Sequence, residues 1–402
     1  MRNQTVLISG ASIAGPALAY WLHRYGFTVT VVERAPALRA GGQAVDFKGR
    51  THLTVLERMG IIDEVRERRT GTTDLAFVDA HGRELGVMPG EFTGGDIEIL
   101  RGDLAEITYR RTADEVEYVF GDSITALDDT PDGVRVRFEH GPDRTFDLVL
   151  GADGIHSRVR ALAFGPEADY VHHLGHHYCV AGSSRWSDAA TPRERARGHA
   201  HNTPGKLAVD GGPKAQQMYM FAAPELDYPR HDVDAQRRVI ERTFADMTWH
   251  APRMLADLAD FDDVYLDSIS QVRMNGAYTR GRVALVGDAA YGNTLAGFGT
   301  GLAIVGAYVL AGELATAAGD HTLAFANYDR IMKRYAKIAG NSNAGRFLAP
   351  KTALGIRARN WFIGSRLFTL MLKYGDKAAN DIDLIDYPTL LPTQPVGGRD
   401  AE

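Results

Sequence analysis

The chain has 402 residues, which at about 150 residues per domain predicts two closely joined units and a short third one. Hydrophobic residues at 45% and charged residues at 24% are globular values, and they exclude a disordered chain, a fibre and a coiled coil. A net charge of -6 argues against nucleic-acid binding, and the single cysteine, Cys179, excludes an internal disulfide and a thiolate-rich metal site. The low cysteine content fits a reducing cytoplasm, which is the location we expect.

The first residues predict a βαβ unit. The run TVLISG at 5–10 is apolar and ends in glycine, so it indicates a buried strand. A helical pattern over 14–25 stops at Gly26, and the β-branched run 28–33 predicts a second parallel strand. Further elements follow along the first half of the chain: helices over 53–59 and 103–111, and strands over 116–120, 134–140 and 146–150.

The pattern changes after residue 164. Alternating aromatic and β-branched residues over 165–274, with turn clusters, predict an antiparallel sheet that a helix at 234–246 interrupts. The buried-strand pattern returns at 282–287, and two long helices are expected at 300–318 and 322–339. We therefore expect an α/β fold with a Rossmann-like three-layer domain, an inserted, mostly antiparallel β-sheet domain and C-terminal helices. The expected segments are 1–164 and 275–320 for the nucleotide-binding domain, 165–274 for the substrate domain and 321–402 for the helical end.

No signal peptide and no membrane-spanning segment is expected. The opening MRNQ leads directly into the first strand, and no apolar run reaches about 18 residues. The best candidate, residues 361–374, carries Arg366 and Lys373. We interpret it as an amphipathic helix packed on the body of the protein, with a position on a membrane surface as the alternative.

The motif GASIAG at 10–15 follows a strand and opens a helix, which is the context that gives a glycine loop its meaning. Gly10 allows a sharp turn, Gly15 allows helix and strand to pack closely, and the helix N-terminus offers N–H groups to a diphosphate. Glu33 ends the next strand, where a carboxylate accepts both hydroxyls of an adenosine ribose, so FAD or NAD is favoured over NADP in this slot. The residues expected at the diphosphate are Gly10, Ser12, Ile13, Ala14 and Gly15.

Two later loops repeat the strand-then-loop arrangement. GADGIHSRVR (151–160) and GDAAYGNTLAGFGTG (287–301) each place an aspartate, Asp153 or Asp288, just past the carboxyl end of a strand, where α/β folds bind ligands. Glycines at 297, 299 and 301 permit close backbone approach, and the helix that they open aims its N–H groups at negative charge.

These three loops, in this order and spacing, resemble the class A FAD-dependent aromatic monooxygenases of the para-hydroxybenzoate hydroxylase fold. The resemblance runs from residue 5 to about 320. The stretches GGQAVDFKG (41–49) and ILRGDL (99–104), and the lack of an extra C-terminal domain, are most similar to the tetracycline-inactivating and antibiotic-tailoring hydroxylases.

The resemblance implies roles for single residues. Glu33 would hold the adenosine ribose, Arg34 would lie near the adenine, and Arg101 would contact the diphosphate and ribityl chain of FAD. Asp288 would bind the ribityl hydroxyls, while Asp153 would touch FAD and the path of the nicotinamide nucleotide. The other implied positions are Gly299, Thr300 and Gly301 at the flavin pyrimidine, and Arg39 and Asp46 at NADPH and the flavin.

The chain departs from the family pattern in the third loop. The usual G-D-A-A-H ends in Tyr291, the Pro-Pro that follows is Thr294–Leu295, the glutamine of G-Q-G is Phe298, and the usual asparagine is Gly301. Because these positions line the front of the flavin in the family, we expect a more apolar wall here.

The resemblance implies an enzyme in which NADPH or NADH reduces FAD, O2 forms a flavin C4a-hydroperoxide, and one oxygen atom enters a bulky aromatic or antibiotic-like molecule. The nicotinamide donor would bind only transiently. The sequence singles out no catalytic acid or base. As substrate-facing residues we expect Gln217, Tyr219, Leu295 and Phe298.

Alternatives on the same scaffold are Baeyer–Villiger oxidation, epoxidation and reduction, and from another class a non-catalytic FAD- or ligand-binding protein. A flavin halogenase fits poorly, because the W-x-W-x-I-P signature is missing. The histidine-rich run 170–178 predicts histidines on a strand, split between its two faces, and we expect no metal. As partners we expect a small aromatic substrate, no nucleic acid and no stable membrane insertion, in a monomer or homodimer.

Overall fold

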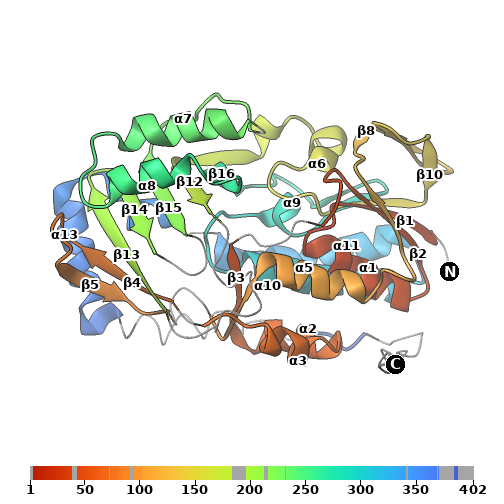
Figure 1. Cartoon of the computed structure of the whole chain (residues 1–402). Coiled ribbons are helices and arrows are strands. Elements are labelled where there is room, and N and C mark those ends of the chain that lie inside the picture. Colours follow the sequence, from red (N-terminus) through yellow and green to blue (C-terminus); the bar gives the residue numbers. More distant parts are fainter. Residues whose placement is uncertain are drawn as a thin grey trace, which may run out of the picture.

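The computed structural model describes residues 3–38, 43–71, 73–90, 95–182, 196–211, 216–230, 232–340, 343–368, 370 and 384–387. Within these residues the chain forms two large sheets and two small ones, with helices packed against the large sheets (Figure 1). The predicted α/β class and the Rossmann-like core with an added antiparallel sheet are confirmed.

The first sheet is mostly parallel and has six strands. Its order is β17-β18-β11-β1-β2-β7, and only β17 runs antiparallel to its neighbour. The strands are β1 (Thr5–Ser9), β2 (Thr28–Glu33), β7 (Glu117–Phe120), β11 (Leu148–Gly151), β17 (Thr279–Arg280) and β18 (Val283–Leu285). Neighbouring strands therefore come from segments far apart in the sequence, as expected for a domain that is interrupted by an insertion.

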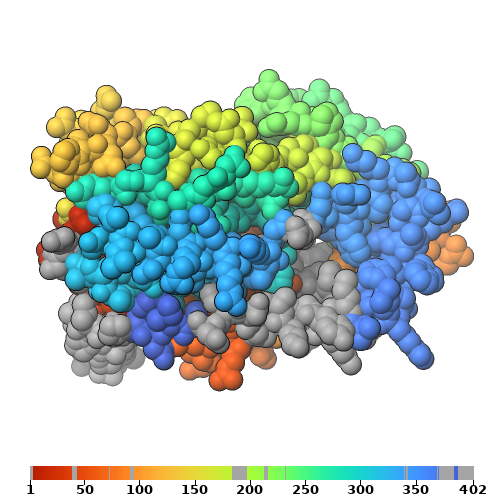
Figure 2. Space-filling model, turned by 180° about the vertical axis from the view of Figure 1, so that it is seen from behind, coloured from red at the N-terminus to blue at the C-terminus, as the bar shows by residue number. Residues whose placement is uncertain are grey.

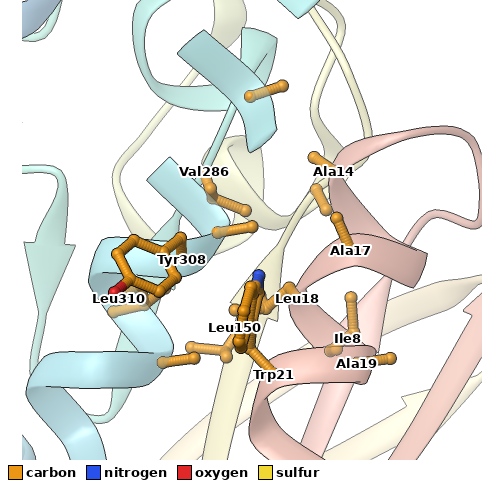
Figure 3. Packing of buried hydrophobic residues seen from close by; sticks show 14 of the residues in the cluster. Ile8, Ala14, Ala17, Leu18, Ala19, Trp21, Leu150, Val286, Tyr308 and Leu310 are labelled. Atoms are coloured by element: carbon orange, nitrogen blue, oxygen red, sulfur yellow. The ribbon is translucent and has the colours of Figure 1, made fainter. Parts of the chain in front are cut away.

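Buried apolar residues join the helices of this domain to the sheet and to each other. Helix α1 (Ala14–Arg24) lies against α10 (Gly299–Thr316), and the Trp21 ring meets the Tyr308 ring edge-on at 4.9 Å between centroids (Figure 3). Leu18, Leu150 and Val286 belong to the same buried cluster. Helix α10 is long and apolar enough to cross a membrane, but 78% of it is buried inside the protein, where it serves as the core helix.

A small antiparallel sheet forms the third layer. Strands β8 (Ile124–Thr130), β9 (Gly133–Phe138) and β10 (Arg144–Phe146) pair in the order β10-β9-β8. Gly133, with a φ of 138°, starts β9 where a side chain would meet the Phe146 carbonyl. Helices, parallel sheet and antiparallel sheet together give the three predicted layers.

The second large sheet has seven strands in the order β16-β12-β15-β14-β13-β4-β5. They are β4 (Thr73–Val78), β5 (Glu84–Met88), β12 (Val171–Ala181), β13 (Ala196–Thr203), β14 (Lys206–Asp210), β15 (Gln217–Ala222) and β16 (Val264–Val272). The sequence-based segments placed 73–88 with the nucleotide-binding domain, but hydrogen bonding joins β4 and β5 to this sheet, with β4 parallel to β13. That pairing was not visible in the sequence because it joins strands more than 100 residues apart.

Two groups of helices cover the two faces of the seven-stranded sheet. Helices α7 (Val233–Phe244) and α8 (Ala251–Leu258) bury the face that carries Cys179 and Tyr219. The opposite face, called here the inner face, carries Tyr178 and Met220 and packs against α12 (Ala344–Leu348) and α13 (Ala353–Ile363).

Shorter elements complete the chain. They are β3 (Ala44–Phe47), which pairs with β6 (Ile97–Leu100), α2 (Gly49–Arg58), α3 (Ile62–Glu67), α5 (Arg101–Arg110), α6 (Arg158–Ala163), η1 (Glu167–Asp169), α9 (Asp288–Tyr291), α11 (His321–Tyr335) and η3 (Ala336–Ala339).

Near the C-terminus, residues 384–387 return to α10. The Tyr387 ring occupies the space beside Gly312 where a side chain would stand, and its hydroxyl donates to Glu313 at 2.7 Å. Arg58 on α2 donates to the Tyr308 hydroxyl and to the Ile385 carbonyl. This short segment therefore ties the end of the chain to the core helix.

Candidate active site

Three loops leave adjacent parallel strands at the same level. In the register of the sheet, Ser9 at the end of β1 lies beside Gly151 of β11 and Val32 of β2, and Gly151 lies beside Leu285 of β18. The loops that begin at Gly10, Ala152 and Val286, and the Glu33 carboxylate, therefore meet at one edge of the sheet. This is the edge at which open α/β sheets bind nucleotides.

The first loop needs both of its glycines. Gly10 has a φ of 105°, and a side chain on it would stand 2.6 Å from the Ala152 carbonyl oxygen. A side chain on Gly15 would overlap the Gly10 carbonyl, so α1 can approach β1 only with glycine there. Helix α1 has no side-chain cap and no acidic residue in its first turn, which leaves its N–H groups to an anion.

Arg101 meets this loop from α5. Its Nε and Nη2 atoms donate to the Ser12 hydroxyl at 3.0 and 2.8 Å. The guanidinium is exposed, so it can contact a bound phosphate as well. Ser12 thus joins Arg101 to the helix N-terminus, and the predicted neighbourhood of Ser12, Ile13, Ala14 and Arg101 is present.

The Glu33 carboxylate is held by two backbone amides. Ala11 N donates to Oε2 at 2.8 Å, and Ala35 N donates to Oε1 at 2.9 Å. A carboxylate has about four lone-pair sites, so two remain for ribose hydroxyls. The next residue, Arg34, is exposed beside it, in keeping with a place near an adenine.

In the second loop, Asp153 turns its carboxylate inward. It accepts from Val159 N at 3.0 Å and from the Ser157 hydroxyl, which itself caps α6. Burial raises the pKa of Asp153, while these hydrogen bonds oppose the rise. In this structure, Asp153 shapes the second loop through these hydrogen bonds.

In the third loop, Asp288 stands at the start of α9, after Gly287 with a φ of 65°. Its side chain is accessible to solvent, yet enough protein surrounds it for desolvation to raise its pKa. Asp288 is therefore open to a ligand at the carboxyl end of β18. Gly299 lies beside it, since a side chain there would come within 3.5 Å of Asp288 Oδ1, and Thr300 follows in the first turn of α10. These residues fit the ribityl and flavin portions of FAD.

Two departures from the family pattern have a structural reason. His52 of α2 fills the space that a side chain on Gly301 would need, and burial lowers the pKa of His52 to about 4, so the imidazole is neutral. Tyr291 points away from the loop surface into the space beside Gly306, where its hydroxyl donates to the Leu302 carbonyl at 3.3 Å. The expectation that Tyr291 lines the flavin front is therefore wrong, because the ring is 7% exposed and belongs to the core.

The four residues expected to face the substrate fall into two groups. Leu295, with an unusual φ of 60°, is half-buried against the cluster of the inner face, and Phe298 is half-buried beneath the Lys48 ammonium. Tyr219 is fully buried on the opposite face, under α7 and α8, and its hydroxyl donates to Gln217 at 2.6 Å. Gln217 and Tyr219 therefore do not reach a molecule that touches Leu295, and the expectation for these two is corrected.

Met218 takes their place, because it is half-buried on the inner face, whereas Met220 on the same face is fully buried. Side chains alternate along β15, and these two methionines point to the inner face. The period of two was visible in the sequence, but the face that α7 and α8 cover was not.

The third loop is fastened to the outer edge of β16, the end strand of the seven-stranded sheet. Val272 N donates to the Gly292 carbonyl at 2.7 Å, and Thr294 N donates to the Ser270 carbonyl at 3.0 Å. These bonds fix Leu295 and Phe298 between the nucleotide-binding edge and the apolar inner face of the sheet.

A polar network that the sequence did not predict crosses the same junction. The Tyr265 hydroxyl donates to Asp267 at 2.7 Å, and Asp267 lies 3.2 Å from His156 Nε2, whose Nδ1 is 3.0 Å from Glu167. Burial would lower the pKa of His156, but the hydrogen bonds to Asp267 and Glu167 outweigh it and raise the pKa. His156 belongs to the second loop, so this network links that loop to the seven-stranded sheet.

Tyr265 is the open end of the network. Tyr265 is 40% exposed, and its ring lies edge-on to Tyr178 at 6.0 Å. Burial raises the pKa of both hydroxyls, and the Arg101 charge opposes the rise. The only sequence signal was the presence of His156 in the loop, because Tyr265 and Asp267 are more than 100 residues away from it.

The two residues expected near NADPH have different outcomes. Asp46 of β3 forms an ion pair with Lys48 at 3.3 Å, and Lys48 lies over the ring of Phe298 in the third loop. Arg39 lies outside the described residues.

The histidine run lies on β12, as predicted, but a bulge changes its pattern. The register shifts between His173 and His177, where Gly175 has a φ of 82°, and the two rings come within 4.8 Å of each other. Among the described residues no group of three or more His, Cys, Asp or Glu side chains could hold a metal.

Comparison with known proteins gives three consistent findings. A family model described as an FAD binding domain matches residues 3–323. The uncharacterized protein Rv1260 of Mycobacterium tuberculosis is 43% identical over 332 residues, which cover 81% of this chain and 88% of the relative. A flavin-dependent monooxygenase of Legionella longbeachae is 37% identical over 347 residues, with 83% and 86% covered.

Among solved structures, the tetracycline destructase Tet(51) is similar with a TM-score of 0.78 at 32% identity. The match covers 95% of this chain and 98% of that one. The likeness therefore includes the seven-stranded sheet and the C-terminal helices as well as the nucleotide-binding domain.

Proposed function

This chain belongs to the family of FAD-dependent monooxygenases, and we propose that it inserts one oxygen atom from O2 into a bulky aromatic or antibiotic-like molecule, with NADPH or NADH as the electron donor. FAD supplies the redox chemistry when it is bound. The observation that carries the proposal is the attachment of the third loop to the seven-stranded sheet. It sets the expected flavin position directly against an apolar face.

The first task of the chain is to hold the cofactor. The N–H groups of α1 and Arg101 would bind the diphosphate, Glu33 would accept from the adenosine ribose, and Asp288 would accept from the ribityl hydroxyls. The first turn of α10 would direct its N–H groups at the flavin pyrimidine, where a helix N-terminus would stabilise negative charge.

The second task is to seat a large apolar substrate and exclude water. Three half-buried side chains lie at the inner-face cluster and offer apolar contact to a bound molecule: Met218, Leu295 and Phe347. Such a surface suits fused rings, because apolar burial drives their binding and a dry site protects reactive oxygen species from water.

The third task is to place a proton. The Tyr265 hydroxyl gives its hydrogen to Asp267, so its oxygen can accept a hydrogen bond from a phenol or enol of the substrate. A proton taken from the substrate would pass to Asp267 and His156 and reach the half-exposed Glu167.

The substrate class is suggested by one relative. Tet(51), which is named a tetracycline destructase, is similar over nearly the whole chain, so tetracycline is the first compound to test. We further propose that the enzyme works as a soluble cytoplasmic protein, as a monomer or homodimer.

The test is oxygen consumption and NADPH oxidation by the purified protein, with tetracycline and a panel of polycyclic phenols. We expect at least one compound to accelerate both rates and to gain one oxygen atom, which becomes heavier when the gas is 18O2. Equal rates with and without every compound, and no oxygenated product, would contradict the proposal.

The proton path is tested separately with Tyr265→Phe. We expect a lower kcat with little change in KM, and a shifted pH profile. Tyr228→Phe is the matched control, since Tyr228 donates to the Leu266 carbonyl on the outer side and is outside the network. Identical pH profiles for both variants would remove Tyr265 from the path but leave the oxygenation itself standing.

A further inference from the structure

The C-terminal part of the chain carries a charge opposite to that of the whole. The protein has a net charge of -6, yet residues 330–375 contain ten Lys and Arg residues and no Asp or Glu. All 51 acidic residues therefore lie elsewhere. A segregation of this kind creates a local positive field in a protein that is acidic as a whole.

Most of these cations are exposed in the structure. They lie on α11, η3, α12 and α13 and in the segments that join or follow these helices, and their side chains are exposed to solvent. The exposed members are Arg330, Lys333, Arg334, Lys337, Arg346, Lys351, Arg357 and Arg366. Figure 2 shows these C-terminal elements, in blue, side by side on one face of the molecule.

Large apolar side chains stand among the cations. Leu354 is 77% exposed, Trp361 is 73% exposed and Leu367 is 58% exposed, which makes them outliers in a chain whose apolar residues are otherwise largely buried. Of the stretch 361–374, expected as an amphipathic helix packed on the body, residues 369 and 371–374 lie outside the described residues. In the described part, helix α13 runs from Ala353 to Ile363, Ile363 and Phe368 are buried, and Trp361 is exposed.

Helix α13 has two distinct sides. Leu354, Arg357 and Trp361 are three and four residues apart and share the exposed stripe, whereas Arg359 and Ile363 are buried. The Arg359 guanidinium lies 3.7 Å from the centre of the Phe77 ring, and this contact anchors the helix on the inner-face cluster. The anchor keeps the exposed stripe turned outward.

We propose that this face, defined by Lys351, Leu354, Arg357, Trp361, Arg366 and Leu367, docks reversibly on an anionic lipid bilayer. Cationic helices with protruding tryptophan and leucine lie in the headgroup region, where the apolar side chains enter the acyl boundary and the cations pair with phosphates. A second copy of this chain is a poor occupant, because a two-fold interface would oppose cation with cation. Bulky aromatic substrates partition into bilayers, so docking would place the proposed oxygenase at their source.

The experiment is co-sedimentation of the FAD-loaded protein with vesicles of phosphatidylcholine alone and of phosphatidylcholine mixed with phosphatidylglycerol. We expect binding only to the anionic vesicles, weakening with added salt. R357E/R366E should reduce the partition by about tenfold or more, because each cation near an anionic surface contributes on the order of fivefold.

The matched control is R135E/R137E, which reverses two exposed arginines on β9 in the nucleotide-binding domain. We expect it to bind like the wild type. A second readout is tryptophan emission, which should shift to the blue on anionic vesicles. The shift should be larger in the wild type than in W361F, and the difference reports Trp361 because the other three tryptophans are common to both proteins.

Three results would overturn the proposal. One is the absence of binding to anionic vesicles at low salt, and another is equal loss of binding in both charge-reversal variants. The third is a wild-type protein that sediments as a dimer and binds no vesicles, together with a W361S variant that sediments as a monomer. That result would assign the face to a second copy of the chain.

Discussion

Replacing Gly15 by alanine tests whether the close approach of α1 to β1 is what makes the diphosphate site. The methyl group would stand 1.8 Å from the Gly10 carbonyl oxygen, whereas carbon and oxygen atoms normally approach to about 3.3 Å. Because the obstacle is backbone, the helix and the loop must separate by roughly 1.5 Å. Forced repacking of this size typically costs about 1–3 kcal/mol of stability.

The same displacement moves the N–H groups that would hold the diphosphate. Each charge-assisted hydrogen bond that is lost weakens binding by about 1.5–3 kcal/mol, so we expect FAD affinity to fall about tenfold or more. The assay combines FAD titration by fluorescence quenching with thermal unfolding of the apoprotein and the holoprotein.

The matched control is Gly26→Ala. Gly26 has a φ of 87° but nothing within 4 Å of a built side chain, so the variant loses about 1 kcal/mol through backbone strain alone. Both variants should melt lower, and only Gly15→Ala should lose FAD. Wild-type FAD affinity in Gly15→Ala would refute the reasoning, because the glycine would then serve packing without serving the ligand.

Three further changes test other contacts. Gly299→Ala should fold normally, since its methyl group meets only a carboxylate oxygen at 3.5 Å, but should bind FAD about tenfold more weakly; unchanged affinity would place the flavin elsewhere. The pairing of His156 with Asp267 contributes stability that is complete below pH 6.5 and is lost as the pH rises through the raised pKa of the imidazole. The melting-temperature difference between wild type and His156→Gln should therefore shrink above neutral pH, and a constant difference would contradict the pairing. Tyr387→Phe should lower stability by about 1–3 kcal/mol by removing a buried donor to Glu313, with the FAD content unchanged, and a loss of FAD would show that the contact does more than fasten the chain end.

Local signals made much of the nucleotide-binding domain predictable. The loop from Gly10 to Gly15 and the carboxylate of Glu33 are encoded within about 30 neighbouring residues, and the strand, turn and helix patterns there agree with one another. The structure adds that Glu33 is already held by two amides, which no spacing in the sequence shows.

Contacts between distant segments were not predictable in the same way. Tyr265 and Asp267 meet His156 only because β16 lies beside the second loop, and β4 joins the sheet only through its pairing with β13. The alternation of side chains along β15 could be predicted from the sequence. Which of the two faces α7 and α8 cover could not, so Tyr219 was assigned to the inner face, where Met220 lies.

The most direct measurement of the central claim is the flavin content of the purified protein. Three loops at one sheet edge should retain FAD, giving a yellow protein with about one flavin per chain after gel filtration, or on reconstitution with added FAD. A colourless protein that binds no FAD in titration would contradict the account, because Glu33, Asp288 and the amides of α1 would then not form an FAD site.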